Sequence, residues 1–388
     1  MSVARTWAVA LTGLHGELVE IEADVTSHTP DFRIIGLPDK TLGEASRRVV
    51  NACENAGLEL PARRVTVNLS PAGLPKQGSG FDLGVAVAAL GVAGVIPLES
   101  IARTVHLGEL GLDGRLRPIA GVLPALRAAA ERGFERAVVP KANRAEGALV
   151  PGIEVIGAVS LPEVARFHGA RDVEVPDQRA VGRVVRRAER ETQGDLQDVV
   201  GQEDAVEAAV AVAAGGHHLL LSGPPGAGKT LLASRLPGIL PPLDDEAALE
   251  VAAVRSLSGE AVDALTRVPP FEAPHHTATL AALVGGGSRV SQPGVISRAS
   301  RGVLMIDEAG EMRASVLDAL RQPLESGRIV IHRSGFTASY PARFQLIGHC
   351  VRLGTIQTSR ERQTGRRSPT GGFGRRLSAT SRERPRAS

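Results

Sequence analysis

The sequence predicts two folded domains of different class, an α+β domain over residues 1–168 and an α/β domain over residues 196–347. The first part mixes strand-like and helix-like segments without a regular order, which is typical of α+β domains. The second part contains a buried strand, a glycine-rich loop and a helical start over Leu219–Ser234. About eighty residues further on, a second apolar strand ends in two carboxylates, and both strands fit one parallel sheet. Residues 169–195 form a charged linker, in which 184–192 has the pattern of a charged helix.

The composition is that of a globular protein with sizeable cores. Of the 388 residues, 43% are hydrophobic and only 3% are aromatic, so Ala, Val, Leu and Gly fill the interior. Cys53 and Cys350 lie far apart and form neither a metal-type spacing nor a disulfide framework, which favours a reducing cytoplasm. The N-terminus lacks a signal-peptide pattern, and apolar runs such as Val85–Ile96 are too short to span a membrane. We therefore expect a cytoplasmic protein without a membrane partner.

The net charge of +3 depends on the C-terminal segment. Residues 348–388 contain ten arginines and two acidic residues, a surplus of eight positive charges, which leaves −5 for residues 1–347. The positive net charge of the whole chain is therefore no evidence that the folded part binds nucleic acid. Because residues 348–388 are rich in Arg, Ser, Thr and Gly, they cannot bury enough apolar surface to fold, and we expect a disordered tail.

The first domain opens with a predicted β-hairpin. Trp7–Leu11 is a short apolar strand, and Leu18–Asp24 alternates apolar and polar residues as a half-buried strand does. The other expected elements are a strand over 32–36, a helix over 41–56, a strand over 64–69, a helix over 81–90, an extended segment over 105–110, a helix over 124–132 and a strand over 137–140.

The glycine-rich loop fits the phosphate-loop pattern G-x-x-x-x-G-K-[ST]. Backbone N–H groups can cradle a triphosphate only where no Cβ blocks their approach, which explains glycine at 226 and 228. Lys229 is expected to reach the β- and γ-phosphates, and the Thr230 hydroxyl to hold Mg²⁺. The alternative is a plain turn between strand and helix, but the flanking strand and helix favour ATP and Mg²⁺ as ligands. The predicted nucleotide-binding residues are Gly223, Pro224, Pro225, Gly226, Ala227, Gly228, Lys229 and Thr230.

The second phosphate element is Val303–Glu308, four apolar residues followed by two carboxylates. Asp307 is expected to hold Mg²⁺ through water, and Glu308 to orient and deprotonate the attacking water. This short pattern is weak alone, since it also occurs as an ordinary strand end. When this pattern follows a phosphate loop in the sequence, it is stronger evidence for a nucleotide site, because the carboxyl ends of parallel strands meet at one edge of the sheet. Lys229 and Glu308 are thus the predicted catalytic residues, and Thr230 and Asp307 the predicted metal ligands.

Two histidine pairs, His217–His218 and His275–His276, invite a metal-binding interpretation. Adjacent side chains on a strand point to opposite faces, so such a pair rarely supplies two ligands. No cysteine or carboxylate spacing completes a site at either pair. We therefore do not expect the pairs to bind a metal.

Several further motifs surround the two carboxylates. They are A-P-H-H-T at 273–277, V-G-G-G at 284–287, Pro293-Gly294, L-R-Q-P-L-E-S-G at 320–327 and P-A-R-F-Q-L at 341–346. With them, residues 3–347 closely resemble the magnesium-chelatase-like AAA+ ATPases, specifically the YifB/ComM family. The resemblance implies an ATP-driven ring motor, hexameric, that acts on DNA as a branch-migration helicase in recombination or natural transformation.

The same resemblance suggests two further contacts. Val200, Gly201 and Gln202 match the stretch that lies against the adenine in AAA+ ATPases, although an ordinary helix N-terminus would look the same. Residues 328–344 alternate around a turn at Ser334-Gly335 and indicate a β-hairpin of the kind that lines the central pore. Its candidates for DNA phosphate contacts are Arg328, His332 and Arg333, and the alternative is a solvated hairpin face.

The first domain resembles the ribosomal-protein-like fold of the Lon proteolytic domain. The matching stretches are Leu74–Ala88, Gly108–Gly121 and Val138–Asn143. That family uses a Ser–Lys pair, but this chain has Gly80 at the serine position, with Ser79 one residue away, and Leu123 at the lysine position. A serine without a neighbouring base is a weak nucleophile. We therefore expect a proteolytically inactive scaffold or interaction module.

The resemblance ends after Ile347. The family continues this strand to a polar sensor residue, usually Asn, and then supplies an arginine finger and a helical lid, whereas this chain continues with Gly348-His349-Cys350. Our hypothesis is a frameshift near codon 347. An arginine finger contributes about 10³–10⁵ in rate, so we expect nucleotide binding with poor turnover. The alternatives to a motor are a nucleotide-binding interaction module and a chelatase-type partner subunit, and the arginine-rich tail itself is able to bind nucleic acid non-specifically.

Overall fold

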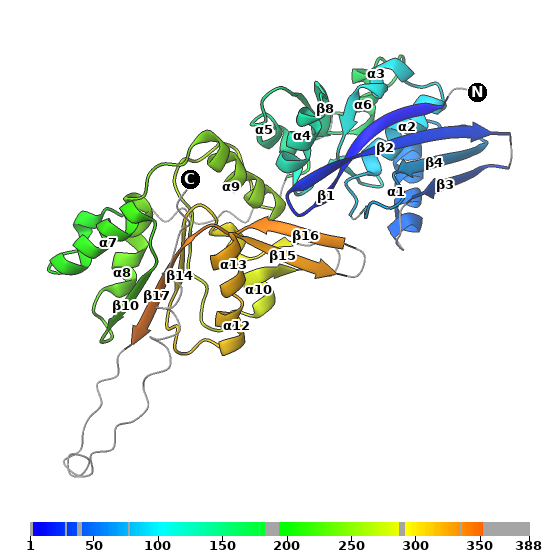
Figure 1. The fold of residues 1–388 in the computed structure, drawn as a ribbon. Helices are drawn as coiled ribbons and strands as arrows, with labels where there is room; N and C mark the ends of the chain where they lie inside the picture. Colours follow the sequence, from blue (N-terminus) through cyan, green and yellow to red (C-terminus); the bar gives the residue numbers. More distant parts are fainter. Residues whose placement is uncertain are drawn as a thin grey trace, which may run out of the picture.

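The chain folds into two domains that contact each other (Figure 1). None of the helices in the part of the chain described here is long and apolar enough to cross a membrane. The computed structural model describes residues 3–27, 29–36, 41–76, 78–177, 179–182, 194–286, 292–333 and 336–351.

The N-terminal domain is built on a seven-stranded mixed sheet in the order β3-β4-β2-β1-β5-β8-β9. The predicted hairpin is confirmed: β1 (Ala4–Thr12) and β2 (His15–Thr26) pair antiparallel down to Thr12 opposite His15. The remaining strands are β3 (Asp31–Ile35), β4 (Arg64–Ser70), β5 (Thr104–His106), β8 (Arg136–Pro140) and β9 (Glu154–Ala158), with a separate small hairpin of β6 (Glu109–Leu110) and β7 (Leu116–Arg117).

Helices complete this domain and close its core. The central helix α2 (Asp82–Val92) is apolar on all sides and buried from Asp82 to Gly91, as expected of a helix enclosed by other elements. It packs on β1 and β2, as does α4 (Val122–Glu131), so helices and a mixed sheet share one core in this domain. The other helices are α1 (Thr41–Asn55), α3 (Leu98–Ala102), α5 (Arg144–Gly147) and α6 (Leu161–Phe167), with a 3₁₀ turn over Lys141–Asn143.

The second domain has a parallel sheet in the order β10-β17-β14-β11. Apolar side chains cover both faces of this sheet. Alternate residues of β14 point to opposite faces, and Val303 and Met305 belong to one apolar cluster whereas Leu304 and Ile306 belong to another. The strands are β10 (Leu219–Gly223), β11 (Phe271–Glu272), β14 (Val303–Ile306) and β17 (Gln345–Val351), with a small hairpin of β12 (Gly285–Gly286) and β13 (Gln292–Pro293). The helices are α7 (Glu203–Gly215), α8 (Lys229–Arg235), α9 (Asp245–Leu257), α10 (Leu280–Val284), α11 (Val295–Arg298), α12 (Ala314–Asp318) and α13 (Arg321–Ser326), with 3₁₀ turns over Leu196–Asp198 and Leu236–Gly238.

Strand β17 corrects one expectation. The sequence placed the start of the disordered tail at residue 348, but β17 continues to Val351 and pairs with β10 as far as Gly223. The physical reason is its central place: with β10 on one side and β14 on the other, its backbone groups find partners whatever the side chains are. Residues 352–388 and the predicted linker helix at 184–192 lie outside the described ranges.

The predicted hairpin after the carboxylates is also present. β15 (Arg328–Arg333) pairs antiparallel with β16 (Phe336–Pro341), from Arg328 opposite Pro341 to Arg333 opposite Phe336. The turn at 334–335 lies outside the described residues.

This hairpin and helix α9 form the contact between the domains (Figure 1). Gly13, in the β1–β2 turn, lies against Ser339 of β16, and a Cβ at Gly13 would come within 2.3 Å of the Ser339 carbonyl oxygen. On the other side, Ala252 and Ala253 of α9 belong to the same hydrophobic cluster as the N-terminal core. The two domains therefore share buried apolar surface.

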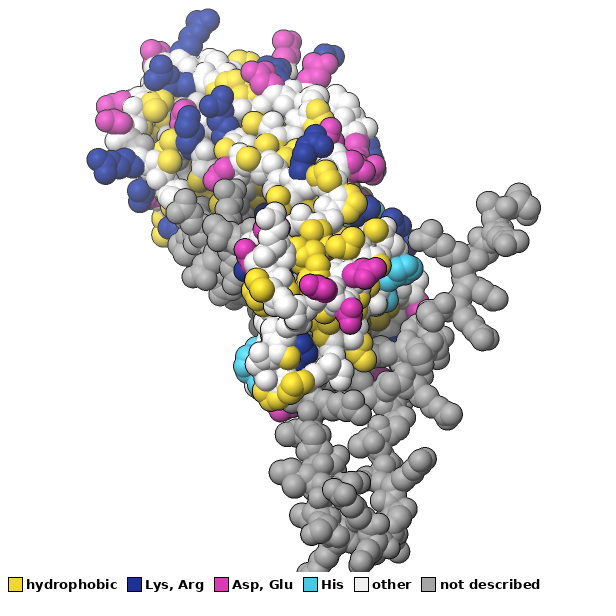
Figure 2. All heavy atoms as spheres, turned by 90° about the vertical axis from the view of Figure 1, so that its left-hand side faces the viewer, with side chains coloured by type: hydrophobic (Ala, Val, Ile, Leu, Met, Phe, Trp, Pro, Cys, Tyr) yellow, Lys and Arg dark blue, Asp and Glu magenta, His cyan; other side chains and the backbone are white. Residues whose placement is uncertain are grey.

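One face of the second domain is apolar at its surface. Val210 of α7, Leu220 of β10 and Leu231 of α8 are exposed hydrophobic side chains on neighbouring elements. Figure 2, which turns the α7 side of Figure 1 toward the viewer, shows hydrophobic side chains with acidic ones around them on this face.

Candidate nucleotide-binding site

The glycine-rich loop connects β10 to α8 with the backbone that the pattern requires. Gly226 and Gly228 have φ values of +77° and +73°, in the left-handed region that glycine adopts without steric cost. No atom lies within 4 Å of where a Cβ on Gly226 would be, so the backbone there is open to an approaching ligand. The loop can therefore present its N–H groups to a phosphate.

Lys229 closes this loop from within. Its side chain is buried, and its Nζ donates hydrogen bonds to the carbonyl oxygens of Gly223 (3.0 Å) and Pro224 (2.7 Å). Thr230, the next residue, is exposed at the start of α8. A fixed ammonium group beside open N–H groups and a hydroxyl group is a suitable donor set for a phosphate chain with Mg²⁺.

The structure brings Gln202 to the loop. Its Nε2 donates to the carbonyl oxygen of Ala227 at 2.6 Å, across the start of α7. Gly201 has a φ of +76°, and Val200 is 87% exposed. Of the three residues predicted to lie near an adenine, Gln202 thus contacts the loop, while Val200 is an exposed apolar side chain two residues earlier in the sequence.

The two carboxylates lie at the same edge of the sheet, at the end of the fully buried strand β14. The backbone N–H of Glu308 donates to Asp307 Oδ1 at 2.9 Å. Glu308 itself has a φ of +47°, a left-handed conformation that is costly for a residue with a side chain. Such strain is concentrated at functional sites, because the surrounding structure must hold it in place.

Asp307 has a partner that the sequence did not suggest. The imidazole Nδ1 of His349, on β17, forms a short hydrogen bond with Asp307 Oδ1. The Nε2 of His349 is buried and has no hydrogen-bond partner among the described residues. His349 was not predicted as a site residue, because it falls in the segment expected to be disordered. A strand that pairs with β10 along its whole length must continue past Ile347, and this requirement was the available signal.

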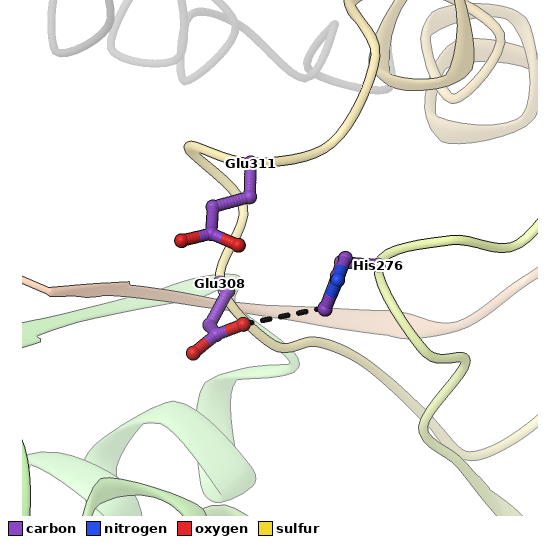
Figure 3. A group of neighbouring side chains, drawn as sticks. All are labelled: His276, Glu308 and Glu311. Carbon is purple, nitrogen blue, oxygen red and sulfur yellow. Dashed lines mark ion pairs between the residues drawn. The ribbon is translucent and has the colours of Figure 1, made fainter.

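A second histidine lies beside Glu308 (Figure 3). His276 Nδ1 is 3.3 Å from Glu308 Oε2, and one ligand atom each of His276, Glu308 and Glu311 lie within 4.8 Å of one another. The sequence spacing of the histidine pair gave no sign of these carboxylates, since they follow 32 and 35 residues later. The register of β11 against β14 brings the segments together.

The comparisons with known proteins agree with this architecture. Models of "Magnesium chelatase, subunit ChlI" and "Subunit ChlI of Mg-chelatase" match residues 195–384 and 21–143, and the first match passes Ile347, where the sequence placed the end of the resemblance. An uncharacterized protein of Mycobacterium tuberculosis is 47% identical over 351 residues, 89% of this chain and 68% of its own. Competence protein ComM of Haemophilus influenzae is 42% identical over 349 residues, with the same coverage. The chain belongs to the YifB/ComM family. Lon protease 2 of Bacillus subtilis matches 38% of this chain and 30% of its own at 26% identity.

The YifB/ComM chain keeps neither member of a Ser–Lys pair at the expected positions of its N-terminal domain. Ser79 forms a short hydrogen bond with Glu109 instead. Leu123 is fully buried, and its N–H faces the Glu146 carboxylate (3.2 Å) and the Ser256 hydroxyl (3.4 Å). Lys76 is buried, its Nζ donates to the Leu74 carbonyl oxygen at 3.1 Å, and burial lowers its pKa.

The second histidine pair and the hairpin have different surroundings. His218 Nδ1 accepts from the N–H of Leu346 at 3.0 Å, at the other end of β17, and burial lowers its pKa. On the hairpin, His332 is exposed and contacts Thr337 Oγ1 at 3.2 Å, and Arg328 is exposed as well. The side chain of Arg333 lies outside the described part of the chain. His218 is thus a structural contact, and His332 is accessible to a large partner.

Proposed function

We propose that this chain binds ATP with Mg²⁺ between the phosphate loop and the carboxylates, and that it hydrolyses ATP slowly. The observation that carries the proposal is the common sheet edge: Gly223 ends β10, Ile306 ends β14, and β17 separates them by one strand. Ligands of α/β proteins bind at the carboxyl ends of such strands. Membership in a magnesium-chelatase-like family supports the same ligands.

Each residue then has one role in the proposed reaction. The N–H groups of residues 223–230 and the ammonium group of Lys229 bind the phosphates, while Thr230 and Asp307 hold Mg²⁺. When bound, Mg²⁺ neutralises charge on the β- and γ-phosphates. Glu308 orients the attacking water and accepts its proton, and Val200, Gly201 and Gln202 line the adenine.

Slow turnover follows from the surroundings of Asp307. His349 already occupies one oxygen of its carboxylate, so magnesium must compete with a hydrogen bond. Strand β17 also carries Gly348 and His349 directly after Ile347, where the family resemblance places a polar sensor residue, usually Asn. Both features oppose efficient hydrolysis, and they favour the alternative of a nucleotide-binding interaction module.

We also propose that the family role is a DNA motor, working as a branch-migration helicase in a hexameric ring. The name of ComM refers to competence, which fits DNA handling in transformation or recombination. The hairpin β15–β16 with its exposed His332 supports a DNA contact. The N-terminal domain, with Gly80 and Leu123 at the proteolytic positions, acts in this proposal as an inactive Lon-like scaffold.

ATP hydrolysis by the full chain and by Glu308→Gln tests the proposal. A radiolabelled assay with stoichiometric ATP should detect slow cleavage by the wild type and at least about tenfold less by the variant. Equal ATP affinity of both, with no cleavage by either, would favour the interaction module. DNA stimulation should persist after deletion of residues 352–388; stimulation lost with that segment would instead assign DNA binding to its arginines.

A further inference from the structure

None of the roles proposed above for binding nucleotide, binding magnesium or activating water belongs to the A-P-H-H-T motif at 273–277. Its histidines follow β11, which runs parallel to β14 with Phe271 opposite Val303 and Glu272 opposite Leu304. Glu272 is fixed by a bidentate ion pair with Arg298, with both N–O distances at 3.1 Å. The segment after β11 is therefore delivered to the same edge of the sheet as Glu308.

Glu308 is held there by its own backbone. Its N–H donates to Asp307 Oδ1 at 2.9 Å, and its carbonyl oxygen accepts from the N–H of Glu311 at 2.8 Å. These two hydrogen bonds maintain the left-handed backbone at Glu308. The backbone conformation thus determines where the Glu308 side chain begins, and the position of its carboxylate depends on what the carboxylate contacts.

His276 makes that contact (Figure 3). Its Nδ1 lies 3.3 Å from Glu308 Oε2, and the figure shows the imidazole approaching from the segment after β11. The His276 ring lies against the His275 ring at a centroid distance of 4.0 Å. His275 is itself fixed, because its Nδ1 contacts Thr277 Oγ1 at 2.9 Å. The motif therefore places one imidazole nitrogen 3.3 Å from the Glu308 carboxylate.

We propose that His276 is a positioning residue that orients the carboxylate of Glu308 for water activation. This inference rests on the proposed ATP hydrolysis. His276 donates through Nδ1 to Oε2, which leaves Oε1 to accept a proton from the attacking water. The proton moves from water to Glu308 while the water oxygen attacks the γ-phosphorus and the bond to the β-bridging oxygen breaks; His276 keeps its own proton throughout.

The state of the His276 ring tests the contact without any activity. In ¹⁵N-labelled full-length chain at pH 8, His276 should carry a proton on Nδ1. The ring resonances are assigned from the difference spectrum with His276→Asn. Glu308→Ala should shift the proton toward Nε2, since the acceptor is gone. An Nδ1 without a proton, or one that does not respond to Glu308→Ala, overturns the proposal.

Single-turnover cleavage of bound ATP tests the consequence. His276→Ala should slow cleavage about 10- to 100-fold at unchanged ATP affinity, because a displaced base loses its geometry. His276→Asn places an amide N–H near the former Nδ1 and should recover most of the rate. Glu311→Gln is the matched control, since it changes the same cluster but leaves the His276–Glu308 contact intact. A His276→Ala rate equal to the wild type overturns the proposal.

A metal-binding role for the cluster predicts different results. Zn²⁺ would then shift the His276 ring resonances in the nucleotide-free chain, and Glu311→Gln would abolish that shift; this outcome also overturns the positioning role. If the wild type binds ATP but never cleaves it, the proposed hydrolysis fails, while the ring-proton experiment still decides whether His276 holds Glu308.

Discussion

Ser256 of α9 donates its hydroxyl to the carboxylate of Glu146 in the other domain. Glu146 also accepts from the Asn143 side chain (3.2 Å) and from the N–H of Leu123 (3.2 Å). The Ser256 carbonyl oxygen accepts in turn from the N–H of Gly121 at 3.1 Å. The N–H of Gly121, which precedes α4, is therefore satisfied across the domain boundary, whereas the N–H of Leu123 contacts Glu146 of its own domain and, at 3.4 Å, the Ser256 hydroxyl. Leu123, which the resemblance to Lon proteolytic domains aligns with their lysine, is thus part of the contact between the domains.

Replacing Ser256 by alanine should weaken the attachment of the two domains. The buried Glu146 carboxylate would lose a donor, at a cost of about 1–3 kcal/mol in the free energy of unfolding. Chemical denaturation measures that cost, and limited proteolysis between residues 169 and 195 should become faster. Ser258→Ala is the control, because the Ser258 hydroxyl donates only within its own helix, to Val254. Equal effects of the two substitutions would mean that the contact does not hold the domains together.

Replacing Lys229 by alanine should reduce nucleotide affinity. Its ammonium group is the buried cation inside the loop, and a charge-assisted hydrogen bond contributes about 1.5–3 kcal/mol, so the dissociation constant should rise at least about tenfold. Fluorescent ATP analogues measure this directly. Lys141→Ala, which removes an exposed lysine of the other domain, should bind as the wild type does. Unchanged binding by the Lys229 variant would place the nucleotide elsewhere.

Replacing His349 by alanine should increase the apparent affinity for Mg²⁺. The substitution removes the hydrogen bond that occupies Asp307 Oδ1, and such a bond to a charged group is worth about 1.5–3 kcal/mol, or about tenfold or more in affinity. A magnesium titration of ATP binding provides the measurement. His332→Ala serves as the comparison, since His332 is exposed on the hairpin. A weaker magnesium response would show that His349 supports the site and does not compete with it.

The N-terminal domain should lose stability in mild acid because of a buried histidine pair. His106 Nε2 and His168 Nε2 are 2.8 Å apart, with Thr6 and Ser100 hydroxyls at the outer Nδ1 atoms, both at 2.7 Å. This contact requires one donor and one acceptor, so it fails when both rings are protonated. Burial lowers the pKa of both, assisted at His106 by the charge of His168 and at His168 by that of Arg136.

These pKa shifts determine how the stability of the domain changes with pH. The pKa of His168 falls from 6.5 to about 4, so between these values the unfolded chain binds more protons than the folded one. Stability is full above pH 6.5 and falls by up to about 3 kcal/mol as the pH approaches 4. Thermal unfolding from pH 8 to pH 4 measures this loss. His168→Gln, which cannot charge, should flatten the curve; an equally steep curve would assign the acid sensitivity to other groups.

Local patterns made much of the fold predictable. The β1–β2 hairpin, α2 and the strand–loop–helix around Lys229 follow from alternation, apolar runs and glycines that lie within about fifteen residues of sequence. The N-terminal sheet order and the extent of β17 could not be predicted, since they depend on pairing between distant strands. His349 entered the site only because β17 lies between β10 and β14.

Only part of the site could be predicted from the sequence, for the same reason. Lys229, Thr230, Asp307 and Glu308 lie in motifs whose residues are adjacent in sequence. The contact of His276 with Glu308 spans 32 residues and depends on the register of a two-residue strand, β11. Ser256 could not be anticipated either, because its partner Glu146 lies in the other domain, 110 residues away.

The order of the second sheet has a practical consequence for handling the protein. Strand β10 is paired on one side only among the described strands, and Leu220 is exposed on it. A half-paired strand with an apolar side chain is a template for joining another copy edge to edge. Glu203, Asp204 and Glu207 of α7, the helix that also carries the exposed Val210, are exposed and repel a like-charged copy. Since salt shortens the range of that repulsion to about 8 Å at 0.15 M, dilute buffer of low ionic strength should keep the protein monodisperse, and concentrated salt should drive it toward fibrous aggregates.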